Sequence, residues 1–364
     1  MGLLYGALDI KDSERPFTDL NGARLIWDYT QELLARYNRE VDDVTRIFVQ
    51  GDTTEFKERY ELAGVGYMQK TDPRIGSQVA AVSRTGNWDV AYPLNQYEEA
   101  IAYNDIALAY LSMGQFEAAI QTVLNVNNRT IFYEIMRALF NNAPPAFSDW
   151  LKGSLTVVPL ANGDAVTYPQ VFGSDTEATE NFYLAPNYAE SGITDTNNPF
   201  QKILDVVEPH FGSPTGGTHV VVFVNRSAMP YVELLTDFVP TPYWNVQPGD
   251  HTAVPVNVGG VQLPEGCRIA GVCNGCTIVV WSRIPSGWMV ATMPGITPAP
   301  IKRRVDDTAS NLTPGLKLIN RDQNYPFTVN QWRNRYGYAV GNRLGAVVVA
   351  LNGTTSYTVP TLYQ

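Results

Sequence analysis

The chain has 364 residues, of which 45% are hydrophobic, and 36 acidic against 26 basic residues give it a formal net charge of −10. This length fits one domain with long excursions or two intertwined domains. The excess of acidic residues argues against a dedicated nucleic-acid binder, so any contact with DNA should be weak and non-specific. No apolar run is long enough to cross a bilayer, and the N-terminus lacks the segments of a secretory signal, so we expect a protein made in a cytoplasm, with no membrane partner.

The first part of the chain predicts an arm, a helix and a long ribbon. Residues 1–17 show no periodicity and begin as an arm. Thr18 or Asn21 can cap a helix whose apolar residues recur at helical spacing as far as Val41. From Asp52 to Leu94, short alternating pieces and turn signals predict a two-stranded ribbon. Such a ribbon is marginal alone in water, so it should be ordered by its own domain or by another subunit.

Residues 97–142 predict a long spine helix. The motif Ser112-x-x-Gln115 has the spacing of a capping box, and apolar residues then keep to one face until Pro144-Pro145 forbids continuation. The polar cluster Asn125–Asn128 indicates a kink or a break in this helix. Short strands punctuated by turns are expected to follow over residues 153–185.

Residues 199–296 change to an α/β pattern. A short helix begins at Pro199, an apolar strand ends at Asn225, and Ser227 opens a second helix. The segments RIAGV, TIVVW and GWMVATM then predict three strands with glycine-bearing turns. We expect this block to form a compact sheet flanked by helices.

The segment Ile301–Leu351 places basic and aromatic residues along extended chain. Tyr336, Tyr338 and Val340 alternate with other residues as in a half-buried strand, and Val347–Val349 predicts a fully covered one. The mixture of Arg and aromatic residues superficially resembles a stacking platform for single-stranded nucleic acid. The same mixture is enriched at protein interfaces. The interface interpretation fits better, because the segment lies beside a hydrophobic strand. The candidate inter-subunit contacts are therefore Arg333, Arg335, Arg343, Trp332 and Tyr336.

We predict no catalytic, cofactor-binding or metal-binding residue. The spacing of Cys273 and Cys276 is that of zinc sites and redox pairs, but with Cys267 they leave a fourth ligand missing. His251 could in principle complete a site, but no second paired motif accompanies these cysteines. These thiols should fill space in a strand and a turn, with no metal or disulfide. The basic run Lys302-Arg303-Arg304 lies close to Asp306-Asp307 and should form local or inter-subunit salt bridges rather than a nucleic-acid patch.

The run W-x-N-R-Y-G-Y-A-V-x-N-R-L-G-A-V-V-V from Trp332 to Val349 resembles the closing strands of major capsid proteins of tailed phages (Caudoviricetes). Phe223-Val224-Asn225 and the segment Trp281–Gly287 are similar to the same family. The resemblance implies an α+β fold of the Hong Kong 97 type. Its expected parts are an N-terminal arm with an amphipathic helix (1–45), an extended loop (46–96), a peripheral domain with the spine helix (97–198), an axial domain (199–296) and return strands of the peripheral domain (297–364).

The same resemblance implies a structural, non-enzymatic protein that assembles as pentamers and hexamers into an icosahedral virion shell around double-stranded DNA, in a bacterial cytoplasm. Expected partners are further copies of the chain, a separate scaffold and a portal; whether cement proteins join them stays open. Some family members cross-link Lys in the extended loop, where Lys57 and Lys70 lie here, but nothing identifies a partner and we predict no cross-link. The alternatives are an encapsulin shell, a Cys-dependent hydrolase built on residues 199–296, and a β-rich tail protein, which the long helix disfavours.

Overall fold

The computed structural model describes residues 20–61, 87–104, 112–149, 152–160, 183–211, 220–240, 257–258, 261–264, 266–294, 300–306, 314–324 and 327–364. The chain divides into two compact units, each built from three separate segments. Unit 1 comprises Met1–Asp43, Leu94–Glu134 and Arg304–Gly337. Unit 2 comprises Val44–Pro93, Ile135–Arg303 and Tyr338–Gln364. Each unit thus combines segments that lie far apart in the sequence.

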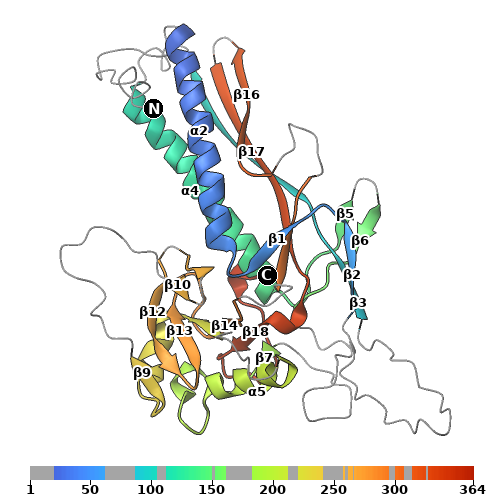
Figure 1. Cartoon of the computed structure of the whole chain (residues 1–364), viewed down its shortest axis with the longest axis vertical. Helices are drawn as coiled ribbons and strands as arrows, with labels where there is room; N and C mark the ends of the chain where they lie inside the picture. Colours follow the sequence, from blue (N-terminus) through green and yellow to red (C-terminus); the bar gives the residue numbers. More distant parts are fainter. Residues whose placement is uncertain are drawn as a thin grey trace, which may run out of the picture. The chain divides into compact units, whose positions relative to one another are not determined.

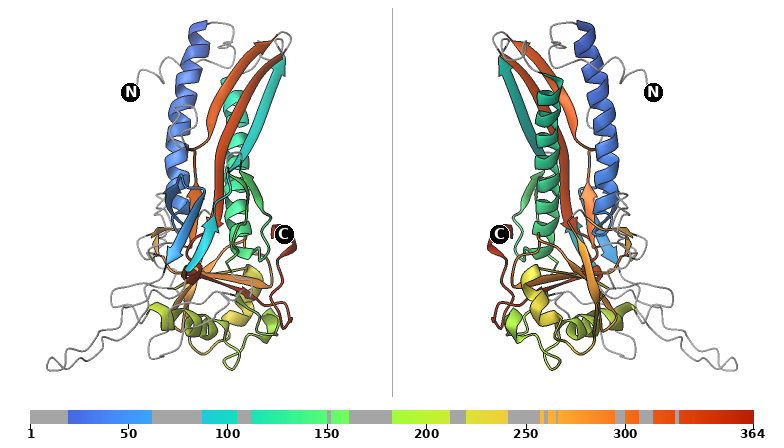
Figure 2. Two further views of the ribbon diagram at one scale, coloured as in Figure 1. Left: turned by 90° about the vertical axis from the view of Figure 1, so that its right-hand side faces the viewer. Right: turned by 90° about the vertical axis from the view of Figure 1, so that its left-hand side faces the viewer.

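Two long helices and three antiparallel strands build unit 1. They are α2 (Leu20–Thr45), β4 (Asn95–Asn104), α4 (Met113–Phe140), β16 (Lys317–Asn324) and β17 (Phe327–Val340), of which α2, α4 and β17 each continue into unit 2. Strand β17 lies between β4 and β16, and its pairing with β4 extends from Phe327 opposite Asn104 to Tyr336 opposite Asn95. The helices lie along one face of this sheet (Figure 2).

The core of unit 1 forms where the helices meet the inner face of the sheet. Leu34 of α2, Phe116 and Ile120 of α4, and Trp332 of β17 are all buried there, together with Val123, Leu124 and Leu316. Because side chains alternate between the two faces of a strand, Trp332, Asn334 and Tyr336 point inward while Gln331, Arg333 and Arg335 lie on the outer face. A single strand therefore supplies both core residues and surface charge.

The predicted helices of unit 1 are confirmed in part. The amphipathic helix exists as α2, but it begins at Leu20, so Asn21 lies inside the first turn and does not cap it; Thr18 lies outside the described residues. The capping box is confirmed, because the Gln115 amide donates to Ser112 Oγ at 3.3 Å and the Ser112 amide donates to Gln115 Oε1 at 3.2 Å.

Two expectations for the spine helix are wrong. Residues 95–104 form β4 and not helix, since Tyr97, Glu99, Ile101 and Tyr103 alternate with period two and the whole segment pairs with β17. The helix also continues through Asn125–Asn128 without a break. Buried Asn127 accepts from Asn334 Nδ2 at 3.0 Å and donates to Tyr37 Oη at 3.0 Å, so its polar atoms are satisfied by partners across the core rather than by competing with the helix backbone.

Unit 2 contains the remaining elements. Its N-terminal and middle strands and helices are β1 (Val49–Thr53), β2 (Lys57–Glu61), β3 (Asn87–Ala91), β5 (Phe147–Asp149), β6 (Gly153–Leu155), β7 (Tyr183–Leu184), α5 (Pro199–Phe211), β8 (Val221–Val224), α6 (Met229–Val232) and β9 (Phe238–Pro240). They are followed by β10 (Asn257–Val258), β11 (Val261–Gln262), β12 (Arg268–Cys273), β13 (Cys276–Val280), β14 (Trp288–Thr292), β15 (Ile301–Arg304) and β18 (Ala346–Ala350). Short 3₁₀ helices lie at Glu190–Gly192, Arg226–Ala228, Arg343–Gly345 and Thr361–Tyr363.

A seven-stranded sheet in the order β7-β18-β14-β8-β13-β12-β9 is the centre of unit 2 (Figure 1). The four residues of β8 are fully buried, and β8 pairs in parallel with β13 and antiparallel with β14. Phe48, Phe223 and Trp281 pack together beside the sheet, with ring centroids 5.2 to 6.2 Å apart. The α/β block expected over residues 199–296 is thus present, and so are its three strands β12, β13 and β14.

Two details of this block differ from expectation. Strand β18 is fully buried as predicted for Val347–Val349, but it pairs with β14 inside the seven-stranded sheet, so residues 297–364 do not all return to a separate peripheral domain. The second helix is only one turn long and does not open at Ser227: Asn225 Oδ1 accepts from the Ser227 amide at 2.9 Å and caps a 3₁₀ turn ahead of α6.

The expected ribbon is paired where the structure describes it. Strands β2 and β3 run antiparallel, with Lys57 opposite Ala91 and Glu61 opposite Asn87. The rest of the ribbon, including Lys70, lies outside the described residues, as do most of the N-terminal arm and His251.

The capping box generates a stability prediction. Ser112→Ala removes the acceptor for the Gln115 amide, so the free energy of unfolding of the isolated chain should fall by about 1 kcal/mol. Urea denaturation provides the measurement, with Ser282→Ala in an exposed turn as the matched control, which should change stability by less than about 0.5 kcal/mol. Equal effects of the two substitutions would show that the cap does not stabilise the helix.

Candidate functional site

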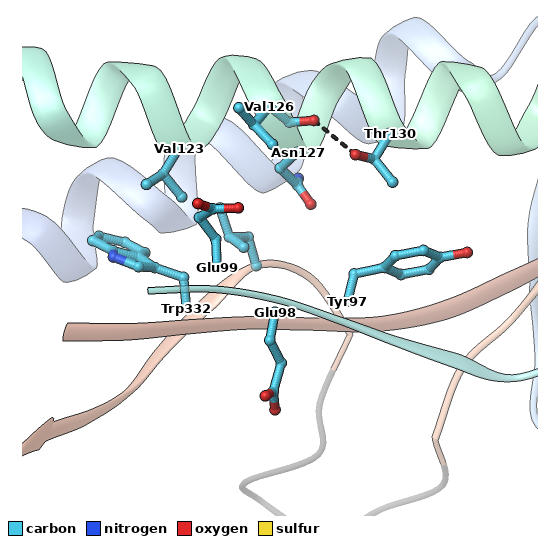
Figure 3. Close-up of a pocket in the computed structure, with 9 residues that line it drawn as sticks. Tyr97, Glu98, Glu99, Val123, Val126, Asn127, Thr130 and Trp332 are labelled. Atoms are coloured by element: carbon cyan, nitrogen blue, oxygen red, sulfur yellow. Dashed lines mark hydrogen bonds between the residues drawn. The ribbon is translucent and has the colours of Figure 1, made fainter. Parts of the chain in front are cut away.

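A pocket of about 120 Å³ lies in unit 1 between α4 and the strands β4 and β17 (Figure 3). Its lining combines apolar and polar side chains, namely Tyr97, Glu98, Glu99, Val123, Val126, Asn127, Thr130, Leu316 and Trp332. Figure 3 shows Glu99 extending towards α4, whereas Glu98 points away from it, as expected for consecutive residues of a strand. The two carboxylates therefore do not converge on one reacting atom, and the lining contains no Ser, Cys or His nucleophile or base. The pocket does not have the composition of a hydrolytic site.

The three cysteines occupy structural positions in unit 2. Cys273 and Cys276 are buried and flank the two-residue turn Asn274-Gly275, whose positive φ angles of 49° and 82° are typical of a tight hairpin. None of the three cysteines, all of which lie in the described part of the chain, forms a disulfide. Burial raises the pKa of Cys267 to about 12 and also raises the pKa of Cys273. A thiol that stays protonated is a poor nucleophile, which argues against the Cys-dependent hydrolase.

Among the described residues, no group of three or more His, Cys, Asp or Glu side chains is placed to hold a metal ion. Within the same part of the chain, no helix combines the length and apolar character that crossing a membrane requires.

Charged pairs connect the base of the ribbon to β15 within unit 2. Glu58 of β2 accepts from Lys302 Nζ at 2.7 Å, from Thr53 Oγ1 at 2.8 Å and from Tyr92 Oη at 3.2 Å. Burial alone would raise the pKa of Glu58, but these hydrogen bonds and the charge of Lys302 outweigh it and hold the pKa below the usual value. The basic run thus forms salt bridges as expected.

Asp52 makes the second of these pairs. Its two oxygens accept from the Arg303 guanidinium at 2.6 and 2.9 Å. Lys302 and Arg303 therefore pair with Glu58 and Asp52, which lie 244 and 251 residues before them in the sequence.

Three of the five candidate contact residues lie inside the chain. Trp332 and Tyr336 are 1% and 2% exposed, and Arg343 is 1% exposed, with its Nε donating to Leu160 O at 2.9 Å. The expectation that these side chains meet a neighbour from the surface is therefore wrong for this conformation. For Trp332 and Tyr336 the reason is strand alternation, which points them at the core. Arg343 is buried because it follows β17 in the 3₁₀ turn that leads into the fully buried strand β18.

Arg333 and Arg335 lie on the outer face of β17 and are half-buried. Arg335 Nη1 is 3.1 Å from Asp306 Oδ2, so its charge is neutralised within unit 1. These two residues remain candidates for contact with another copy.

An exposed apolar patch lies at the edge of the seven-stranded sheet in unit 2. Val239 of the edge strand β9 is 65% exposed and lies directly opposite Val272 of β12, which is 41% exposed. Leu234, in the turn between α6 and β9, is 79% exposed. We call Leu234, Val239 and Val272 the edge patch. The sequence analysis missed it because the segment that begins at Ser227 was predicted to be a helix; the signal for a short edge strand was Pro240, at which β9 ends.

Comparison with known proteins places the fold. No family model and no curated protein matches the chain. A solved structure from Mycobacterium phage Patience is similar over 95% of this chain and 92% of its own, with 22% sequence identity and a TM-score of 0.69. The chain has the Hong Kong 97 capsid fold. The α+β fold class expected from the sequence is thereby confirmed.

Two further structures are similar to this Hong Kong 97 fold at lower scores. The bacteriophage PhiM1 mature capsid is 12% identical over 84% of this chain and 86% of its own, with a TM-score of 0.49. The holo-SrpI encapsulin complex from Synechococcus elongatus PCC 7942 is 8% identical over 87% of this chain and 89% of its own, with a TM-score of 0.46.

The Glu58 cluster generates a pH prediction. Because the pKa of Glu58 is depressed in the folded chain, its stabilisation is complete above the usual pKa of 4.5 and is lost as the pH falls through the folded-state value. Glu58→Gln should therefore destabilise the chain by about 1 kcal/mol near neutral pH, with the difference from wild type shrinking below pH 4.5. Urea titrations at several pH values test this, with exposed Glu55→Gln as the control. A constant difference across the range would contradict the assignment.

The burial of Trp332 generates a second prediction. Trp332→Ala should lower the free energy of unfolding of the unassembled chain by about 3–5 kcal/mol, because it leaves a cavity in the core of unit 1. Arg333→Ala, on the other face of the same strand, should cost less than about 1 kcal/mol. Similar small effects for both substitutions would restore Trp332 as a surface contact residue.

Proposed function

We propose that this chain is the major capsid protein of a tailed phage. In this function, copies assemble as pentamers and hexamers into an icosahedral shell that encloses a double-stranded DNA genome. The observation that carries the proposal is the fold shared with the Mycobacterium phage Patience chain over 95% of this sequence, because nearly the whole chain is accounted for by one shell-protein fold.

The edge patch supports self-association. An edge strand presents unpaired backbone groups with which another chain can pair. Here the edge strand carries Val239 at 65% exposure opposite Val272 at 41%, and Leu234, in the turn that precedes the strand, is 79% exposed. Apolar area of this kind is stabilised by a partner that removes it from water, and repeated copies of the chain are the partner that a shell supplies.

The remaining parts of the proposal follow from the shell. The protein is structural and carries out no reaction, is located in the virion capsid after assembly in the host bacterial cytoplasm, and works with a separate scaffold and a portal. Packaged DNA is held weakly, in keeping with the formal charge of −10. An encapsulin shell is the second candidate, since it shares the fold, and the particle contents separate the two: nucleic acid for a phage shell, protein cargo for an encapsulin.

Assembly is the direct test. The purified wild-type chain should form particles or capsomers of five and six subunits, visible by negative-stain microscopy and by size-exclusion chromatography with light scattering. A stable monomer at every concentration and salt would overturn the proposal.

The edge patch makes the test residue-specific. The double variant Leu234→Asp with Val239→Asp should keep the fold, because both side chains are exposed, and should reduce particle yield by roughly tenfold or more, because it places charge in an apolar contact. Leu362→Asp, a substitution at 62% exposure in the C-terminal 3₁₀ turn, is the matched control. If control and double variant lose assembly equally, the edge patch has no specific part in it.

A further inference from the structure

The pocket between α4 and the strands β4 and β17 is smaller than an ordinary ligand site. Small-molecule sites have volumes of roughly 300–1,000 Å³, whereas this pocket has a volume of about 120 Å³. A cavity of about 150 Å³ holds a molecule the size of benzene. The volume therefore fits the end of a single side chain, which is a group that a neighbouring protein surface can supply.

The pocket can be reached from outside the chain. Val126 of α4, which lines it, is 43% exposed, and Glu99 of β4 is exposed as well. The other apolar side chains of the lining, Val123, Leu316 and Trp332, belong to the buried core of unit 1. An occupant can therefore pass Val126 and Glu99 and rest against core residues without rearranging them.

Two polar groups of the lining can accept hydrogen bonds from an occupant. Glu99 lies directly opposite Trp332 in the pairing of β4 with β17, and its side chain extends towards α4 (Figure 3). Within the described part of the chain, its carboxylate makes no hydrogen bond and no ion pair. Thr130 Oγ1 donates to Val126 O at 2.9 Å, so the lone pairs of this hydroxyl oxygen are left to accept.

Two donors near the pocket do not serve an occupant. Asn127 is buried and engaged at both ends, since its Nδ2 donates to Tyr37 Oη at 3.0 Å and its Oδ1 accepts from Asn334 Nδ2 at 3.0 Å. Trp332 Nε1 has no hydrogen-bond partner among the described residues, but this atom is shut off from solvent and from an incoming group. The pocket is therefore suited to a donor that carries positive charge rather than to an anion.

We propose that this pocket receives the end of a Lys or Arg side chain from a second copy of this chain. The inference rests on the proposed function, because it requires copies to meet. The cationic group pairs with Glu99 and donates to Thr130 Oγ1, which gives charge-assisted hydrogen bonds. Its methylene stem lies against Val123 and Val126, as the stems of long basic side chains do on apolar surface. The aromatic ring of Tyr97 adds attraction for a cation.

A metal ion does not suit the pocket. Calcium takes roughly six to eight oxygen ligands, most of them from converging carboxylates and carbonyls. The carboxylate of Glu98 points away from α4, where it accepts from Gln96 Nε2 at 2.6 Å and from Gln331 Nε2 at 3.0 Å. Glu99 is left as the single carboxylate of the pocket, which is enough for one basic side chain.

A second copy of the chain is a suitable source of this side chain. Each copy carries 26 basic residues, and Arg129 and Arg226 are among the exposed ones in the described ranges. The formal charge of −10 makes copies repel one another at long range. A local contact between opposite charges offsets part of this repulsion and fixes the orientation in which two copies meet.

Neutralising Glu99 tests the site. Glu99→Gln should raise the lowest concentration at which the purified chain forms particles by roughly tenfold, because a charge-assisted contact is lost from every copy. Glu98→Gln makes the same chemical change on the other face of the strand and should assemble like wild type. The inference is wrong if Glu99→Gln assembles as well as wild type, or if both variants lose assembly equally.

Stability and salt separate a contact role from a structural one. Glu99→Gln should leave the urea midpoint of the unassembled chain unchanged, because the carboxylate has no partner in the described chain. Its assembly defect relative to wild type should shrink in about 1 M NaCl, where charges are screened beyond about 3 Å. A lower midpoint would show that Glu99 stabilises its own chain, and a defect that persists at high salt would show that charge is not the cause. Either result overturns the inference.

Filling the pocket tests it without a change of charge. Val126→Phe should occupy the pocket with its own ring and weaken assembly by a similar factor, whereas Gln121→Phe, at another exposed position of α4, should not. Normal assembly of Val126→Phe, or equal losses in both variants, would contradict a role for the pocket. Failure of the wild-type chain to form particles is a different result, because it refutes the proposed function itself and this inference with it.

Discussion

The alternation of side chains along β17 is the constraint on which unit 1 depends. This strand pairs on both sides, with β4 over ten residue pairs and with β16, so its register is fixed by backbone hydrogen bonds. Once register is fixed, Trp332 and Asn334 must face the helices and Arg333 must face away. A slip of one residue would put Arg333 into the core and Trp332 on the surface. The core and the charged face are therefore not independent features, because the same pairing creates both.

Much of the fold could be predicted from local patterns. The capping box at Ser112 and Gln115, the hairpin turn between Cys273 and Cys276, and the buried run Val347–Val349 are each specified by residues adjacent in sequence. Such signals rely on turn chemistry, capping and periodicity, which need no knowledge of distant partners. The resemblance to the fold was carried by Trp281 and by the Trp332–Val349 run, in which Trp332, Tyr336 and Val347–Val349 are buried.

The candidate site was less predictable, because it depends on long-range pairing. Residue type alone does not tell whether Arg333, Arg343 and Trp332 lie at a surface or in a core. Only the strand register and the burial of β18 show that Trp332 and Arg343 are buried and that Arg333 is on the outer face. The assignment of residues 97–104 to a helix was wrong for a related reason: their alternation is short, and the ten-residue pairing with β17 decides the outcome.

Net charge and local charge act differently when copies of this chain meet. At long range a formal charge of −10 on each copy repels the next, and salt weakens this repulsion over a Debye length of about 8 Å at physiological ionic strength. At contact distance, a half-buried ion pair is screened much less. Net charge should therefore govern how often copies approach, and short-range ion pairs should govern the orientation in which they stay together. Apolar area such as the edge patch has no comparable directional preference, so a chain that must repeat one geometry many times needs both kinds of contact.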